Sequence, residues 1–222
     1  MKFKNEEVTF LGWLDNVWYH YKAGIVIGVF AIVFVAVAMT QFITRDEHDV
    51  FVYCVGDHGL SAEAGDKFMQ EMQDCFTVDS NGDGKKVVDL KVDKFVMTED
   101  ANGKRHVYNP SEQLSITERF NLELATGECV VYIMEPAFFK GNLKYLASLE
   151  EELGYLPENS IDGKGIALKD LISYKATTTL GYFPEDYIIC LADREDRFDA
   201  GYYDGNVKFL NNLIKYNLVS GN

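Results

Sequence analysis

The sequence predicts an α/β protein: one N-terminal transmembrane helix followed by a mainly parallel three-layer α/β domain. Three observations carry this prediction. Residues 23–43 form an apolar run without a charged side chain. The rest of the chain contains three short apolar runs rich in β-branched and aromatic residues, at 50–55, 129–134 and 187–192. Two segments with helical apolar spacing lie between the first two of these runs, which is typical of alternating strands and helices.

The apolar run from Ala23 to Ile43 is predicted to be an uncleaved membrane span. A helix that rises about 1.5 Å per residue needs about 20 apolar residues to cross a hydrocarbon core of about 30 Å. A cleaved signal peptide has a shorter apolar segment, about 7–15 residues, with a small-x-small site close behind it. Here the only such pattern, residues 36–38, lies inside the run.

The flanks of this run predict its orientation in the cell membrane. Lys2, Lys4 and Lys22 precede it, whereas only Arg45 follows closely. Because lysine and arginine favour the cytoplasmic side, we expect residues 1–22 to be a cytoplasmic leader and residues 44–222 to be an extracellular domain.

The leader is unusually aromatic, with Trp13, Trp18, Tyr19 and Tyr21 close to the start of the span. Tryptophan and tyrosine favour the headgroup region, where an apolar ring and a polar edge are both satisfied. An interfacial helix is therefore expected here. The alternative is a surface that docks a membrane-protein partner.

The predicted extracellular domain is large enough for one core, at roughly 175 residues, and it is acidic. Residues 46–222 carry 17 basic and 32 acidic side chains, a net charge of -15. Such a surface repels nucleic acid and anionic lipid, and it suits neutral or cationic ligands or divalent cations. The alternative is that the charge serves solubility alone.

The four cysteines are predicted to be free thiols. No two form a Cys-x-x-Cys pair, and Cys54, Cys129 and Cys190 each lie in an apolar run, where cysteine behaves as a small hydrophobe. A disulfide is permitted outside the cell, but spacing does not assign one.

The first half of the domain reads as strand, helix, strand. The helix after strand 50–55 has Ser61 as its N-cap, and Phe68 and Met72 lie on its apolar face. In the next strand, Val88, Leu90 and Val92 alternate with charged residues, which indicates that one face of this strand is more exposed to solvent.

The second half is predicted from the same patterns. We expect a loop over 101–110, a helix from Ser111 or Ser115 that ends at Gly127, and the strand 129–134. After these we expect a helix with leucines at 143, 146, 149 and 153, a hairpin or loop over 161–179, the strand 187–192 and a last helix through Val207 and Leu210. This order predicts right-handed βαβ units and hence parallel strands.

Three carboxylates are candidate ligand-binding residues. Asp57, Glu135 and Asp193 each follow a predicted strand end. The carboxyl ends of parallel strands are where α/β proteins place ligands, so these side chains could share one rim for an unknown small molecule. The alternative is three unrelated charged loops.

The segment from Asp79 to Lys85 is a candidate Ca²⁺ site. Asp79, Asn81 and Asp83 stand at positions one, three and five of the pattern D-x-[DN]-x-[DN]-G, and Lys85 at position seven would supply a backbone carbonyl. Position twelve is Leu90 instead of glutamate, which excludes a helix-loop-helix hand. The alternative is a tight polar turn, because Asp, Asn and Gly also form turns.

Several stretches resemble known families. The segment VFVYCVGD, the spacing of two helices and the segment ERFNLELATGECVVYIMEP resemble one lobe of a periplasmic-binding-protein-like domain. The Asp79 loop resembles the calcium loop of periplasmic galactose/glucose-binding proteins, in which a distant glutamate completes the shell. The whole chain resembles uncharacterised single-pass membrane proteins of Gram-positive bacteria, a resemblance that implies no activity.

No catalytic motif is found: the chain has no G-x-S-x-G, no H-E-x-x-H and no P-loop. The sequence therefore favours a membrane-anchored binding or accessory module over an enzyme. The alternatives are a scaffold or assembly factor of a membrane complex, and an anchored hydrolase that uses the three rim carboxylates.

Overall fold

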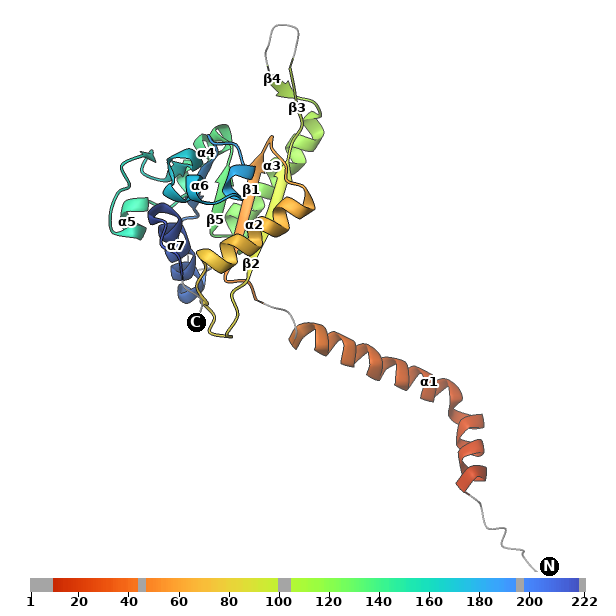
Figure 1. Ribbon diagram of the computed structural model, residues 1–222. Coiled ribbons are helices and arrows are strands. Elements are labelled where there is room, and N and C mark those ends of the chain that lie inside the picture. Colours follow the sequence, from red (N-terminus) through yellow and green to blue (C-terminus); the bar gives the residue numbers. More distant parts are fainter. Residues whose placement is uncertain (1–9, 44–46, 100–104, 195–197, 220–222) are drawn as a thin grey trace, which may run out of the picture. The chain divides into compact units, whose positions relative to one another are not determined.

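The computed structural model describes residues 10–43, 47–99, 105–194 and 198–219 (Figure 1). The chain divides into two compact units, residues 1–46 and 47–222, which are described separately.

The first unit is one helix, α1 (Phe10–Ile43). Within it, Trp18–Met39 is long and apolar enough to cross a membrane by length and composition, and none of this stretch is buried. The predicted apolar helix is therefore present, and it continues into the leader without a break in helical structure. Figure 1 shows α1 bent between a shorter N-terminal part and a longer part.

The second unit is built on a six-stranded sheet of order β2-β1-β5-β8-β7-β6. The strands are β1 (Val50–Gly56), β2 (Val88–Lys94), β5 (Val131–Met134), β6 (Ser160–Ile161), β7 (Gly165–Ala167) and β8 (Ile188–Leu191). Strand β1 runs parallel to β2 and β5, whereas the β5–β8, β8–β7 and β7–β6 pairs are antiparallel. The sheet is therefore mixed, and the predicted mainly parallel arrangement is wrong.

The direction of β8 is the source of this error. All four residues of β8 are buried, because the strand lies inside the sheet between β5 and β7. A continuous apolar run indicates burial on both faces and is most common in parallel sheets, but it does not encode strand direction. The short β6–β7 hairpin precedes β8, and β8 pairs antiparallel with both β7 and β5.

Helices pack on both faces of the sheet (Figure 1). Along β1, Val52 and Cys54 belong to the core cluster that contains residues of α2 (Ala62–Cys75) and α7 (Ala200–Lys215). The alternate residues Tyr53 and Val55 belong to the cluster that contains residues of α3 (Pro110–Thr126). This alternation is the period of two that a strand imposes on its side chains.

The helix ends follow ordinary capping chemistry. The Ser61 side chain caps α2 and accepts a hydrogen bond from the Ala64 amide at 3.2 Å, as predicted. Gly127 caps the C-terminal end of α3, also as predicted. The N-terminal end differs: Asn109 is the N-cap and Pro110 the first helical residue, so α3 begins before Ser111.

The predicted helix through four leucines is wrong. The chain there forms α4 (Pro136–Gly141), a 3₁₀ turn η1 (Leu143–Tyr145) and α5 (Leu149–Leu153). Between the last two, Leu146 is extended and bridges Ala192 beside β8. The helix-like spacing of these leucines arises because Leu146 and Leu149 are both buried, although they lie in separate segments of the chain.

Two connecting regions contain more structure than expected. Residues 105–107, inside the predicted loop 101–110, form β4 (Arg105–Val107), which pairs antiparallel with β3 (Met97–Glu99). The region 161–179 contains the expected hairpin, β6–β7, and also η2 (Leu168–Asp170) and α6 (Ile172–Ala176); η3 (Leu180–Tyr182) follows it. The four cysteines are free thiols, and the three in apolar runs are buried, as predicted.

Candidate functional site

Two of the predicted rim carboxylates lie at the same edge of the sheet. Asp57 follows β1 and Glu135 follows β5, and these strands are parallel neighbours. Helix α2, which follows β1, packs on one face of the sheet, and α3, which precedes β5, packs on the other. The carboxyl ends of β1 and β5 therefore form a topological switch point, the usual ligand position in open α/β sheets.

Asp193 is not part of this rim. It follows β8, which runs antiparallel to β5, so it lies at the opposite edge of the sheet. The expectation that Asp193 joins Asp57 and Glu135 is wrong for the same reason that the parallel sheet is wrong.

The region around Asp57 is closely packed. The Tyr187 hydroxyl donates a hydrogen bond to Asp57 Oδ1 at 2.9 Å and accepts one from the His58 amide at 3.0 Å. A side chain at Gly56 would overlap the Tyr187 ring, so glycine is required for this approach. Burial raises the pKa of the Tyr187 phenol, which keeps it a hydrogen-bond donor to the carboxylate.

Glu135 lies where β5 leads into α4. Its backbone amide donates to Val55 O at 3.0 Å, which continues the β1–β5 ladder by one bond. Its side chain makes no capping bond to α4, and its Oε2 atom is buried. The two carboxylates thus end neighbouring strands, with Tyr187 bonded to one of them.

The Asp79 loop is a series of turns closed by side-chain oxygens. The two oxygens of Asp79 accept hydrogen bonds from the amides of Gly82 and Gly84, at 2.6 and 2.9 Å. Both glycines have positive φ angles, +75° and +83°. These are the geometry and residue types of Asx turns.

The rest of the loop repeats this pattern. Asn81 Oδ1 accepts from the Asp83 amide at 2.9 Å, and Asp83 Oδ1 accepts from the Lys85 amide at 2.8 Å. Within the ranges that the structure describes, no group of three or more His, Cys, Asp or Glu side chains is placed to hold a metal ion. The turn geometry is thus shown, and calcium binding stays a prediction.

Asp49 is a structural residue that the sequence analysis missed. It is fully buried, and its Oδ1 accepts from the Ser80 amide and hydroxyl while its Oδ2 accepts from the Val87 amide at 2.9 Å. Its backbone carbonyl accepts from the Asn206 side chain of α7 at 3.0 Å. The only sequence signal is an acidic residue directly before the apolar strand that begins at Val50.

A polar groove between α5 and α7 was also missed. Arg194 lies after β8, with its guanidinium 4.5 Å from the centre of the Tyr203 ring. It pairs with Asp204 and, at 3.6 Å, with Glu152. The groove beside these side chains has a volume of about 300 Å³. Its residues come from segments far apart in the sequence, so no local pattern predicts it.

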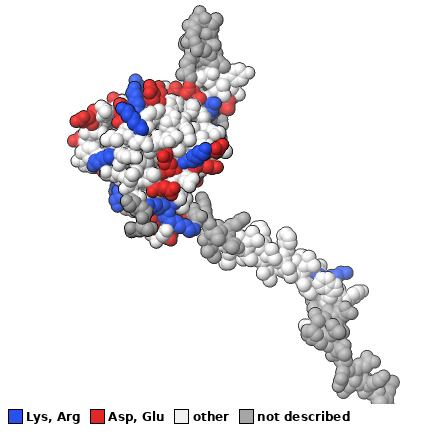
Figure 2. Space-filling model, viewed as in Figure 1, with Lys and Arg blue, Asp and Glu red and all other residues white. Residues whose placement is uncertain are grey.

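Acidic and basic side chains are scattered among uncharged residues on the visible face of the domain, with the two signs interspersed (Figure 2). No protein-family model matches the chain, and neither a curated protein nor a solved structure matches it. Function must therefore be inferred from these sites themselves. They consist of carboxylate, guanidinium, amide and phenol groups, which bind by charge and hydrogen bonding.

Proposed function

We propose that the chain is a membrane-anchored binding or accessory module, in which α1 holds the acidic α/β domain on the outer side of the cell membrane. One observation carries this proposal: a long, exposed apolar helix precedes a domain that has its own buried core.

The exposed surface of α1 supports a membrane as its environment. Phe30, Ile32 and Val33 are each more than half exposed, and at about 100° per residue they point to different sides of the helix. A helix that is apolar all round needs an apolar surrounding, which the hydrocarbon core of a membrane supplies. The excess of lysines before the helix supports an inside N-terminus.

The ligand side of the proposal rests on the switch point. Asp57 and Glu135 end parallel neighbouring strands, and two carboxylates at such a position suit a cationic or hydroxyl-bearing ligand.

We also propose that Ca²⁺ stabilises the Asp79 loop. An ionised carboxylate has about four acceptor positions, so the backbone bonds to Asp79 leave oxygens available for a hard cation.

The anchoring proposal is tested by labelling with a membrane-impermeant thiol reagent on intact cells. In a Cys75→Ser background, Lys169→Cys places a thiol on an exposed position of the domain and Asn5→Cys places one in the leader. We expect the first to be labelled on intact cells and the second only after lysis. The reverse pattern, or recovery of both variants in the soluble fraction, contradicts the proposal.

A scaffold or assembly factor is the second candidate function, favoured by the exposed aromatic residues of α1. Trp18, Tyr19 and Tyr21 are each more than half exposed. Changing all three to alanine should release a membrane-protein partner if they form a docking surface. Changing Asp57 and Glu135 to alanine should instead leave such a complex intact, which separates the two functions.

A further inference from the structure

We propose that the groove between α5 and α7 binds a small zwitterion, a molecule of amino-acid or dipeptide size that carries both a carboxylate and an ammonium group. The proposal rests on the binding function above and names a second site and its ligand class. The groove is separate from the switch point, because Arg194 follows β8 at the opposite edge of the sheet.

The size of the groove sets the size of the ligand. A volume of about 300 Å³ is at the lower end of the range for small-molecule sites. Leu153 of α5 and Val207 of α7 contribute its apolar part. Five polar residues line the remainder: Glu152, Arg194, Asp204, Lys208 and Asn211.

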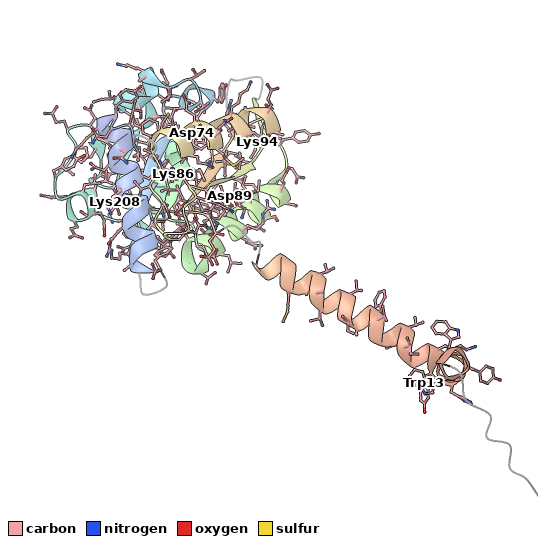
Figure 3. All side chains as sticks on the ribbon, turned by 60° about the horizontal axis from the view of Figure 1, so that its bottom comes forward. Trp13, Asp74, Lys86, Asp89, Lys94 and Lys208 are labelled. Atoms are coloured by element: carbon pink, nitrogen blue, oxygen red, sulfur yellow. The ribbon has the colours of Figure 1, made fainter. Side chains whose placement is uncertain are left out.

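The groove offers hydrogen-bond donors that the fold does not use. Lys208 is exposed on α7 (Figure 3), and among the described residues its ammonium group forms no ion pair or hydrogen bond. Asn211 Oδ1 accepts from the Tyr155 hydroxyl at 2.8 Å, which orients the amide and leaves its NH₂ group as a donor. A carboxylate of the ligand can bind to these two groups.

The groove also offers acceptors at fixed positions. The Glu152 side chain is only 15% exposed, and Asp204 faces it across Arg194. Arg194 is held in place by both carboxylates and by the face of the Tyr203 ring. These oxygens keep further acceptor positions, which an ammonium group can use.

The balance of charge favours a zwitterion over a simple ion. Glu152 and Asp204 oppose Arg194 and Lys208, so the lining is neutral as a whole. A lone anion would be repelled by the two carboxylates, and a lone cation by the guanidinium and the ammonium. A ligand that presents both charges satisfies both sides.

A purely structural ion-pair network does not account for all of this lining. Arg194 with Glu152 and Asp204 ties α5 to α7, which explains those three residues. This ion-pair network involves neither Lys208 nor the amide nitrogen of Asn211, and both residues line the groove.

The test is NMR titration of the isotope-labelled full chain in nanodiscs with L-alanyl-L-alanine as the probe. We expect saturable shifts on α5 and α7, and a dissociation constant at least tenfold higher for Lys208→Ala. Lys208→Arg should restore binding, and Lys169→Ala, at an exposed lysine outside the groove, is the matched control. The N-acetylated and the amidated dipeptides, which each lack one charge, should bind at least tenfold more weakly.

Three outcomes would overturn the inference: no saturable shift up to about 10 mM probe, unchanged affinity in Lys208→Ala, or a blocked dipeptide that binds as tightly as L-alanyl-L-alanine. Because Lys208 is exposed, its loss should leave the fold intact, and the unligated spectrum of the variant checks this. Failure here is distinguishable from failure of the anchoring proposal, since the thiol labelling on intact cells does not depend on the groove.

Discussion

The buried carboxylate of Asp49 holds Ser80 by two hydrogen bonds, from the Ser80 amide at 2.7 Å and from its hydroxyl at 2.9 Å. The other Asp49 oxygen accepts from the Val87 amide. One side chain directly before β1 therefore holds this part of the chain at two points, Ser80 inside the loop that contains Asp79 and Val87 after it. The loop is positioned by this contact as well as by its own turns.

Replacing Asp49 with alanine should destabilise the domain by about 3 kcal/mol. The substitution leaves the Ser80 and Val87 amides without a charged acceptor in a part-buried position, and a hydrogen bond to a charged group is worth about 1.5–3 kcal/mol. Urea unfolding of the full chain in detergent, followed by circular dichroism, measures the loss. Asp66→Ala, at an exposed position of α2, is the control and should change stability by less than about 0.5 kcal/mol.

Gly205→Ala should also destabilise the domain, by about 1–2 kcal/mol, although alanine is the better helix former. A Cβ atom at Gly205 of α7 would lie 2.7 Å from Ser80 Cβ, so the loop would have to move away from the helix. Gly181→Ala is the matched control, because a Cβ there meets nothing within 4 Å. Equal melting temperatures for the two variants would show that the loop does not rest closely on α7.

The calcium proposal predicts a stabilisation that depends on concentration. A ligand present at about ten times its dissociation constant adds about 1.4 kcal/mol, which corresponds to a rise in Tm of about 3–6 °C for a domain of this size. The rise should be absent in Asp83→Ser, and Mg²⁺ at the same concentration controls for ionic strength. An unchanged Tm at about 5 mM Ca²⁺, above the dissociation constants of about 10⁻⁴–10⁻³ M that extracellular calcium modules have, would leave the loop as a turn only.

Cys75 should be the single thiol that reacts in the folded domain, and it should react slowly at neutral pH. It is partly exposed, whereas Cys54, Cys129 and Cys190 are buried. Burial, with added repulsion from Glu71 and Asp74, raises the Cys75 pKa and so lowers its thiolate fraction.

Labelling with a chromogenic disulfide reagent measures this reactivity. The rate should rise steadily as the pH increases from 7 to about 9.5, because the thiolate is the reactive form. Asp74→Asn removes one negative charge beside the thiol (Asp74 is labelled in Figure 3) and should increase the rate about two- to threefold at pH 8. Rapid labelling of more than one thiol before unfolding would contradict the burial of the other three.

Local patterns predicted much of the fold correctly. The run from Val50 to Val55 is a buried strand, Ser61 caps the next helix, and Phe68 and Met72 pack into the core. These features depend on hydrophobic period and capping, which neighbouring residues encode. The prediction of one helix through the leucines from 143 to 153 was wrong, because separate short segments can bury leucines at the same spacing. Leu146 is extended against Ala192, and Leu149 begins α5.

The candidate sites divide in the same way. Asp57 and Glu135 were correctly placed at one edge, since both follow parallel strands joined through helices. Asp193 was misplaced, because its position depends on the direction of β8. Asp49 and the groove around Arg194 were missed, since each is assembled from segments that lie far apart in the sequence.

The sequence by itself determined the apolar helix, the acidic α/β domain and the turn at Asp79, because each follows from composition or from spacing within a few turns of chain. The tertiary structure decided the direction of β8, the division of the carboxylates between two edges of the sheet, and the meeting of Glu152 with Arg194 and Asp204. Those features depend on which distant segments pair, and pairing is settled by packing of the whole core, which no local pattern encodes.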